Sequence, residues 1–403
     1  MGLAPIGQGT CLNGELGHQA DSWQATFTAN LDNETEVSMA QEKIRLGIIG
    51  ANVGYGWTPR AHIPALAHLS EFELAAVCTA HEETARESAE KFGVPLAFHN
   101  HHTMLEEADI DVVAVVVRVP IHHQLTMDVL QAGKHVYTEW PLGANLSEGR
   151  EMADLARSKG VQTMVGLQSR TSPAFLTMRD MIADGYVGEV LSCHLDQTGS
   201  GVLSRPSGRT WQRDVTLGAN TLTISFGHAI DALCMCLGEF SEVASVVSTR
   251  VPQWHETDTD RMVDVTSPDN ILISGTLTSG AVVSAHASSV PWHGSGYRFE
   301  VYGREGTLVL TSGGSPSTGG SRLLGGKGTD SVLEEMPLMP RHTWVPGAVP
   351  QGPAFNIAQL WGRFAQAIRS GERAEPDFDT AVTRHELLDA IQRASDTGQR
   401  QSL

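Results

Sequence analysis

Basic side chains are scarce in this chain of 403 residues. It carries 28 lysines and arginines against 46 aspartates and glutamates, which gives a formal net charge of -18 at pH 7. Such an acidic surplus repels a phosphate backbone and an anionic membrane surface alike. The composition therefore predicts no nucleic-acid partner.

Cysteines and long apolar runs are also scarce. The five cysteines are odd in number and lack the spacing of a disulfide framework, which predicts reduced thiols and a cytoplasmic location. No stretch approaches the roughly 18 apolar residues that a membrane span needs, and no apolar segment follows a basic N-terminus. We expect neither a membrane span nor general export.

The first 42 residues are rich in Gly, Asn, Thr, Gln and acids, without the period of about 2.0 or about 3.6 that would bury one face. We predict that residues 1–42 form a disordered tail. The rest of the chain is too long for a single hydrophobic core, so two domains are expected.

Residues 43–166 alternate short apolar runs with helical patterns. The predicted strands are 44–49, 72–78, 112–117, 135–139 and 163–165, and the predicted helices are 82–92, 122–132 and 147–159, the last with Ser147 as its N-cap. Strands that alternate with helices imply a parallel, doubly wound sheet. We therefore predict an α/β Rossmann domain over residues 43–166.

The pattern changes after residue 166. A helix over 173–184 is followed by β-branched stretches at 189–198, 244–250, 270–278, 281–289, 297–302 and 307–310, joined by turn signals typical of hairpins. Residues 313–329 are Gly- and Ser-rich and are expected to form a loose surface loop, before helices at 355–368 and 380–394. Residues 167–403 are predicted to form an α+β domain with an open, mainly antiparallel sheet. An exposed apolar sheet face is rarely left in water, which predicts a homodimer or homotetramer.

A glycine-rich turn lies between the first strand and the first helical pattern. It contains Gly50, Asn52, Gly54 and Trp57. In such a turn, backbone amides and a helix N-terminus can hold a pyrophosphate, and Asn52 replaces a glycine with the residue that best tolerates a left-handed backbone. After the second strand, Thr79 and His81 stand near the place of the carboxylate that usually binds the ribose of NAD, so the predicted cofactor is NAD or NADP.

Several longer motifs follow in order. They are Gly54-Tyr-Gly56-Trp57, Ala61-His62-Ile-Pro64, Val119-Pro120-Ile-His122, Glu139-Trp140-Pro141-Leu142, Gly166-Leu-Gln168-Ser-Arg170 and Phe226-Gly227-His228-Ala-Ile-Asp231. The chain resembles the glucose-fructose oxidoreductase, inositol dehydrogenase and MocA family over residues 44–400, and most closely its branch of fungal galactose-pathway repressors. The resemblance implies a Rossmann domain plus an open-faced sheet domain, with nicotinamide and ligand meeting between them. It places Val119, Pro120, His122, Glu139 and Trp140 at the dinucleotide.

The chain departs from this family at the reacting centre. The family's dehydrogenases place a lysine after the fifth strand and an aspartate four residues before a histidine. Those positions are Trp140, Ile224 and His228 here. Oxidation of an alcohol needs a base for the hydroxyl proton, and an imidazole can supply one. His228 is therefore the predicted proton carrier, with Asp231 either holding its ring or bonding backbone or a neighbouring strand.

Three residues are candidate substrate contacts. Gln168 and Arg170 follow the last Rossmann strand, where both can bond ligand hydroxyls or a carboxylate and Arg170 can instead form an interdomain ion pair. Trp211 precedes the His228 helix and is expected at the rim of the pocket. Trp140 offers a flat wall for nicotinamide or a sugar face, or packs in the core.

A group of histidines stands apart from these motifs. His99, His101, His102, His122 and His123 lie close in sequence. They lack the Cys/His spacing of zinc sites, so no metal is predicted.

Three functions remain open from the sequence. The first is an NAD(P)-dependent oxidoreductase acting on a sugar, polyol or related hydroxy compound, with a carbohydrate-like small molecule as its partner. The second, implied by the repressor resemblance, is a non-catalytic NAD(P)-binding regulator of a partner protein. The third is a glycosidase-like or isomerising enzyme that oxidises and re-reduces a sugar transiently. Net NADH formation separates the first from the others.

Overall fold

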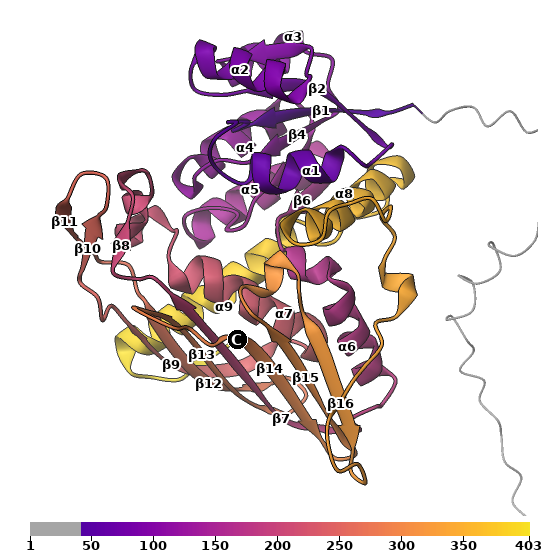
Figure 1. Cartoon of the computed structure of the whole chain (residues 1–403), viewed down its shortest axis with the longest axis vertical. Helices are drawn as coiled ribbons and strands as arrows, with labels where there is room; N and C mark the ends of the chain where they lie inside the picture. Colours follow the sequence, from indigo (N-terminus) through magenta and orange to yellow (C-terminus); the bar gives the residue numbers. More distant parts are fainter. Residues whose placement is uncertain (1–41) are drawn as a thin grey trace, which may run out of the picture. The chain divides into compact units, whose positions relative to one another are not determined.

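The computed structural model describes residues 42–403, and two sheets organise this range (Figure 1). The predicted disordered tail falls on residues 1–41, outside the described part, except for Glu42. Within residues 42–403, the helices are too short or too polar to cross a membrane.

The first sheet has six parallel strands in the order β3-β2-β1-β4-β5-β6. They are β1 (Ile44–Ile49), β2 (Phe72–Cys78), β3 (Leu96–Phe98), β4 (Val112–Val115), β5 (His135–Thr138) and β6 (Thr163–Val165). The strand order reverses between β1 and β4, the place where doubly wound sheets bind ligands at their carboxyl edge. Strand β3 was not predicted, because its apolar run Leu96–Phe98 is only three residues long and is largely exposed.

Short helices connect these strands. They are η1 (Thr58–His62), α1 (Ile63–Leu66), α2 (Glu82–Phe92), α3 (His101–Glu107), η2 (Val119–Ile121), α4 (His122–Gln131) and α5 (Leu146–Lys159). The prediction of Ser147 as an N-cap is wrong by two residues. The side chain of Asn145 accepts the backbone N–H of Glu148 at 3.0 Å and caps α5.

Helix α8 (Pro353–Ser370) packs beside α1, although almost the whole chain separates them in sequence (Figure 1). Its buried side chains Ile357, Trp361 and Phe364 share one core with Leu46 and Ile48 of β1. One face of the first sheet is therefore completed by residues from the end of the chain.

The second sheet has nine strands in the order β17-β16-β15-β14-β7-β13-β12-β9-β18. They are β7 (Val190–Ser200), β9 (Phe240–Ser248), β12 (Asn270–Leu277), β13 (Val282–Val290), β14 (Gly296–Gly303), β15 (Gly306–Ser312), β16 (Arg322–Lys327), β17 (Glu334–Glu335) and β18 (Gln401–Ser402). All neighbours pair antiparallel except β7 and β13, which confirms the predicted open, mainly antiparallel sheet.

The expectation of a loose loop over 313–329 is wrong. Residues Arg322–Lys327 are β16, and a short helix, η7 (Pro316–Thr318), places Pro316 and Ser317 in buried positions. Strand β16 pairs along β15, so backbone hydrogen bonds order a segment whose glycines and serines carry little apolar signal.

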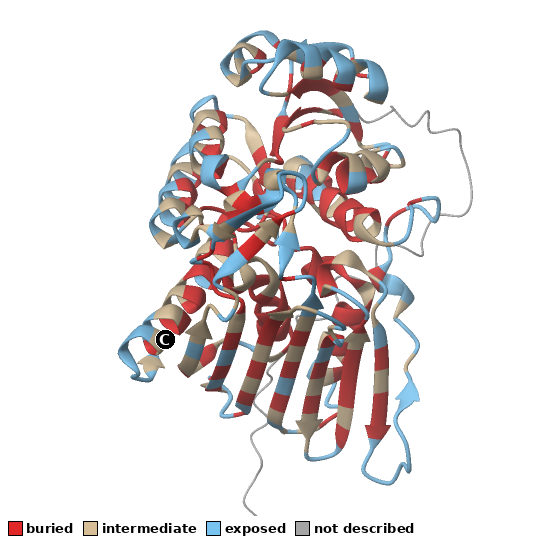
Figure 2. Cartoon of the chain, turned by 60° about the vertical axis from the view of Figure 1, so that its left-hand side comes forward, coloured by how far each residue is buried: buried red, intermediate tan, exposed pale blue. Residues whose placement is uncertain are grey.

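Three helices pack against the second sheet: α6 (Pro173–Ala183), α7 (Gly227–Leu237) and α9 (Phe378–Thr397). Buried and exposed residues alternate along the strands, as Figure 2 shows. Several apolar side chains remain exposed on this sheet: Leu191, Val246, Leu272 and Val282.

Smaller elements complete the description. A three-stranded sheet is formed by β8 (Ser204–Arg205), β10 (Gln253–Glu256) and β11 (Arg261–Asp264). The remaining short helices are η3 (Gln168–Thr171), η4 (Ser207–Arg213), η5 (Val215–Leu217), η6 (Thr221–Phe226) and η8 (Pro340–His342).

Candidate functional site

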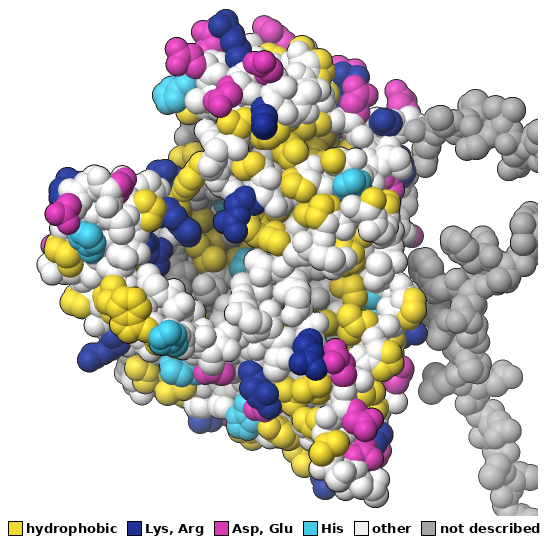
Figure 3. Space-filling model, in the orientation of Figure 1, with side chains coloured by type: hydrophobic (Ala, Val, Ile, Leu, Met, Phe, Trp, Pro, Cys, Tyr) yellow, Lys and Arg dark blue, Asp and Glu magenta, His cyan; other side chains and the backbone are white. Residues whose placement is uncertain are grey.

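A cavity of about 640 Å³ runs from the carboxyl edge of the first sheet to η6 and α7. It brings together most of the residues predicted from the sequence: Gly50, Asn52, Trp57, Thr79, His81, Val119, His122, Glu139, Trp140, Gln168, Trp211 and His228. Gly54, Pro120, Arg170 and Asp231 are not among the lining residues. The surface is hollowed in this region, with hydrophobic and basic side chains beside the hollow (Figure 3).

The glycine-rich turn after β1 is shaped by close backbone contacts. Gly50 has φ of 93°, and a Cβ there would lie 2.1 Å from the carbonyl oxygen of Val116, so only glycine fits. Asn52 accepts the N–H of Gly54 through Oδ1 at 3.0 Å, and Thr58 donates its hydroxyl to the Gly50 carbonyl at 2.9 Å. At Gly56 a Cβ would meet no atom within 4 Å, so the turn stays open beside the cavity.

The end of β2 presents hydroxyls to the cavity. The hydroxyl oxygens of Thr79 and Thr84 are hydrogen-bonded at 2.7 Å, and the Thr79 hydroxyl also lies 3.0 Å from the backbone oxygen of His81. Arg60 lines the same cavity and lies 5.8 Å from the ring of Trp57. Hydroxyls, an imidazole and a guanidinium therefore stand near the place of the usual carboxylate.

Glu139 lines the cavity and is held by three donors. His62 reaches its Oε1 at 2.7 Å, the Tyr137 hydroxyl donates to the same oxygen at 3.1 Å, and Gln168 donates to Oε2 at 3.0 Å. The indole of Trp361, on α8, donates to Nδ1 of His62 at 3.1 Å. Nε2 of His62 therefore carries the hydrogen and donates to Glu139. Sequence reasoning assigned no role to Trp361, since it lies 299 residues from its partner.

Trp140 joins the two parts of the site. Its indole donates to the backbone oxygen of Thr223 at 2.8 Å, and a Cβ on Gly227 would lie 2.7 Å from the indole nitrogen. The ring also packs against His385, with ring centroids 4.8 Å apart. The side chain is 5% exposed and packs in the core while also lining the cavity, and its contact with nicotinamide or a sugar face stays a prediction.

His228 faces the cavity from the start of α7, one turn after Ile224. Within the described residues its ring makes no hydrogen bond, and Nδ1 is fully buried, so Nε2 is the nitrogen available to a ligand. Burial lowers the pKa of His228 to about 4, although the charges of Glu139 and Asp231 act in the opposite direction. The imidazole is therefore neutral near pH 7.

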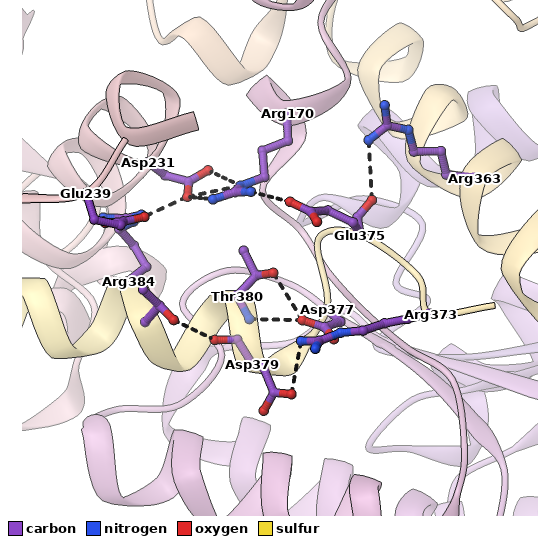
Figure 4. A network of polar contacts seen from close by, with 11 residues as sticks. Arg170, Asp231, Glu239, Arg363, Arg373, Glu375, Asp377, Asp379, Thr380 and Arg384 are labelled. Carbon is purple, nitrogen blue, oxygen red and sulfur yellow. Dashed lines mark hydrogen bonds and ion pairs between the residues drawn. The ribbon is translucent and has the colours of Figure 1, made fainter. Parts of the chain in front are cut away.

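Asp231 does not hold the ring of His228. Its carboxylate accepts Arg170 Nη2 at 2.8 Å and Arg384 Nε at 3.3 Å, both from buried side chains (Figure 4). Burial alone would raise the pKa of Asp231, but the two guanidinium groups outweigh burial and lower it. The prediction of Asp231 as an orienting group is wrong, and the alternative of a bond to backbone or a neighbouring strand is wrong too, because its partners are the side chains of Arg170 and Arg384.

Arg170 is likewise structural. Besides Asp231 it donates to Glu375 at 2.5 Å, while Arg384 donates to Glu239 at 2.8 Å (Figure 4). The predicted ligand contact by Arg170 is wrong, because its guanidinium is occupied by this buried network. The network connects η3 with α7 and α9 and fixes the helix that carries His228.

The cavity has lining residues that the sequence did not single out. Arg118 donates to the backbone oxygen of Gly208 at 3.0 Å and lies 5.8 Å from the ring of Tyr55 and 5.7 Å from that of Trp211. It therefore reaches from the first sheet to η4 beside Trp211, which was expected at the rim. Ser315, Ser317 and Thr318 also line the cavity, and their low-complexity segment gave no local signal.

The histidines that lie close in sequence do not form one group in the structure. His122 is buried, with Nδ1 2.8 Å from the Pro141 oxygen and Nε2 3.1 Å from the Val117 oxygen, and His123 meets Glu151. Away from the cavity, His101 and His102 lie beside Asp128, and their ligand atoms fall within 4.8 Å of one another. The absence of a bound metal stays a prediction.

Two family profiles match consecutive parts of the chain. The oxidoreductase family with an NAD-binding Rossmann fold, which comprises glucose-fructose oxidoreductase, inositol dehydrogenase and MocA, matches residues 44–167. The Gal80p C-terminal domain matches residues 173–312. Over these residues the chain is similar to this oxidoreductase family and to the Gal80p C-terminal domain.

Known relatives include an enzyme and a regulator. "Dehydrogenase aclE" of Aspergillus oryzae is 28% identical over 379 residues, covering 89% of this chain and 98% of that protein. The galactose/lactose metabolism regulatory protein GAL80 of Saccharomyces cerevisiae is 28% identical over 256 residues, covering 59% of each chain. A solved super-repressor mutant of Gal80p has a TM-score of 0.79 at 22% identity, covering 90% of this chain and 98% of that one, so it shares the fold.

The match of residues 44–167 to an NAD-binding Rossmann fold confirms the predicted nicotinamide dinucleotide cofactor. The residues fit such a group: the turn from Gly50 to Gly56 leaves open space beside the cavity, and the hydroxyls of Thr79 and Thr84 lie at the end of β2. The neutral hydroxyls and the nearby Arg60 are compatible with either NAD or NADP.

Proposed function

We propose that this chain is an NAD(P)-dependent oxidoreductase that acts on a sugar, polyol or related hydroxy compound. One observation carries the proposal: a single cavity is lined by the dinucleotide-binding turn on one side and by His228 on the other. The nearly full-length likeness to a protein named as a dehydrogenase supports an enzyme. Levoglucosan dehydrogenase, 27% identical over 294 residues, supports a carbohydrate-like substrate.

The residues at the first sheet would hold the dinucleotide. Gly50, Asn52 and Gly56 would meet the pyrophosphate, and Thr79 with His81 would meet the adenosine ribose. Val119, His122 and Trp140 would flank the nicotinamide, whose ring takes up a hydride when an alcohol is oxidised.

His228 would take the proton of the substrate hydroxyl at Nε2. Glu139 is a weaker candidate, because His62, Tyr137 and Gln168 already donate to its two oxygens. With a pKa of about 4, the His228 ring holds its accepting lone pair throughout the neutral range, although it is a weaker base than an ordinary imidazole. Glu139 would instead keep Gln168 at the cavity wall.

The experiment measures reduction of NAD, then NADP, by purified full-length chain with a panel of sugars and polyols. We expect turnover that falls about 10²- to 10⁴-fold in His228→Asn while the Kd of the dinucleotide is kept. His99→Asn, which changes an exposed side chain, serves as the control and should leave turnover unchanged. Because the pKa of His228 is lowered to about 4, kcat/KM should show no acid limb near pH 6.5. Normal turnover of His228→Asn would assign the proton path to another group.

A non-catalytic regulator is the second candidate. It is favoured by Trp140 and Ile224 at the family's lysine and aspartate positions, and by the match to the Gal80p C-terminal domain. Tight NAD(P) binding by a wild-type chain that turns over no sugar or polyol would select this function, and a co-purifying protein partner would support it.

We also propose the assembly and location of the protein. Residues 43–166 would form the domain that binds the dinucleotide, and residues 167–403 the domain that binds the substrate. Helix α8 would pack with the first of these domains although it lies in the second by sequence. Exposed Val246, Leu272 and Val282 on the second sheet support a homodimer or homotetramer. The free, buried thiols of Cys78, Cys193, Cys234 and Cys236 support the cytoplasm.

A further inference from the structure

A second, smaller cavity of about 150 Å³ adjoins the main one. Arg209, Gln212, Ile224 and Ser225 line both cavities, so the two are neighbours. Ser225 and Ile224 lie on η6, directly before the helix of His228. A group in this side pocket would therefore belong to the same ligand whose hydroxyl meets His228.

The side pocket is polar and positively charged. Arg205 and Arg209 line it together with the side chains of Gln212, Asn220, Thr221, Ser225, Ser267 and Ser289. Within residues 42–403, neither arginine forms an ion pair with a carboxylate. The recorded side-chain hydrogen bond of Arg205 goes to the neutral amide oxygen of Gln212 at 2.5 Å.

Asp269 also lines the pocket, but its carboxylate oxygens are hydrogen-bonded to groups other than Arg205. Its two oxygens accept the backbone N–H groups of Arg250 and Val251 at 2.7 to 3.0 Å and the amide of Asn270 at 2.8 Å. These donors are neutral, so the carboxylate keeps its charge, but it hydrogen-bonds to them and, within residues 42–403, forms no ion pair with Arg205.

Arg205 is thus a poorly compensated charge in a partly buried position. Its guanidinium lies 4.0 Å above the ring of Trp254, which shields one face from water. Burial, followed by the like charge of Arg209, lowers the pKa of Arg205 to about 10. An uncompensated buried cation is costly, and an anionic ligand would remove that cost.

We infer that this side pocket binds a carboxylate or phosphate group of the substrate, so that the preferred substrates are anionic sugars such as sugar acids or sugar phosphates. The inference rests on the proposed function and narrows its substrate class. A guanidinium pair matches the geometry of either anion, and the polar neighbours supply further hydrogen bonds. The main cavity adds Arg60 and Arg118, so basic groups gather at this site in a chain of net charge -18.

The test is isothermal titration calorimetry of the full chain saturated with NAD. The probes are D-glucuronate and D-galacturonate as carboxylates, the two hexose 6-phosphates as phosphates, and D-glucose and D-galactose as uncharged parents. At least one anionic class should bind about tenfold or more tightly than its parent, and the better class identifies which anion the pocket takes. Equal binding of the anionic and parent sugars would overturn the inference.

Two variants test whether the arginines of the side pocket cause the preference for anionic sugars. Arg205→Met keeps an unbranched apolar stem and removes the guanidinium with its charge, and it should abolish the preference for the anion. Arg209→Met changes an exposed side chain, so it tests the pocket even if Arg205→Met folds poorly, and it should weaken the same preference. Arg213→Met, on the same short helix but outside the lining, is the matched control and should retain the preference. A preference that survives both pocket variants would also overturn the inference.

A parallel assay of NAD and NADP reduction separates this inference from the proposed function. Anion binding that depends on Arg205 without formation of either NADH or NADPH would refute the oxidoreductase and leave the pocket. NADH formation from the parent hexoses, with no advantage for their acids or phosphates, would refute the pocket and leave the oxidoreductase.

Discussion

Mild acid should destabilise this protein through two buried histidines. Burial lowers the pKa of both His228 and His385 to about 4, whereas the same groups have a pKa of 6.5 when unfolded. Above pH 6.5 both states hold neutral rings, and the folded chain keeps its full stability. As the pH falls below 6.5 the unfolded chain binds protons first, so stability is lost until the folded rings also titrate near pH 4.

These pKa values set the size of the effect. At pH 5 each histidine removes about 2 kcal/mol of the free energy of unfolding, or about 4 kcal/mol for both. This is a large fraction of the roughly 5 to 15 kcal/mol that stabilises an ordinary protein. The difference in the free energy of unfolding between pH 7 and pH 5 is therefore easy to measure.

Urea unfolding at pH 7 and pH 5, followed by tryptophan fluorescence, measures the loss. His385→Phe keeps a ring beside Trp140 but cannot titrate, so its loss between the two pH values should be about 2 kcal/mol smaller than that of the wild type. His99→Phe changes an exposed histidine and serves as the control. If His385→Phe and the wild type lose the same free energy, the argument from burial is refuted.

Three further predictions concern the turn, the buried network and the sheet. Gly50→Ala should abolish NAD binding in calorimetry because its Cβ would lie 2.1 Å from the Val116 oxygen, whereas Gly54→Ala should bind normally because its Cβ would meet only Asn52 Oδ1 at 3.9 Å; equal affinities would contradict this. Arg170→Met should lower the free energy of urea unfolding by about 3 to 5 kcal/mol, because it leaves Asp231 poorly paired. Arg304→Met, which breaks an exposed pair with Glu189, should lower it by only about 0 to 1 kcal/mol. Similar losses in the two variants would count against the network. Light scattering should find a dimer or tetramer, and Leu272→Lys on the exposed sheet face should yield monomer; a wild-type monomer at micromolar concentration would remove this expectation.

The cofactor half of the site could be predicted because its signal is local. The turn with Gly50 follows one strand and precedes one helical segment, so neighbouring residues define both the fold and the place of the pyrophosphate. Thr79 and Trp140 stand at the ends of other strands of the same sheet, and their place in the cavity follows from the topology. Glu139 follows for the same reason, whereas Trp361, which donates to the Glu139 partner His62, does not.

The substrate half could be predicted only in part, since its partners lie far apart in the chain. Arg170 and Asp231 are 61 residues apart, and Arg384 joins them from 153 residues beyond Asp231, so no short pattern distinguishes a structural ion pair from a ligand contact. The lowered pKa of His228 likewise depends on burial by several elements. Residues 313–329 show the opposite error, because Ser317 is buried in a short helix and Arg322–Lys327 pair as a strand, which the composition of glycines and serines does not encode.

Helix α8 has a consequence for how the chain is made. Its Trp361, Phe364 and Ile357 close one face of the first sheet, whose strands lie between residues 44 and 165. During synthesis those strands leave the ribosome about two hundred residues before their cover does, with apolar side chains such as Leu46 and Ile48 still unprotected. The nascent Rossmann segment therefore keeps an apolar face uncovered until α8 has been made. A fragment that ends near residue 166 should expose this face and aggregate rather than fold as a free dinucleotide-binding module.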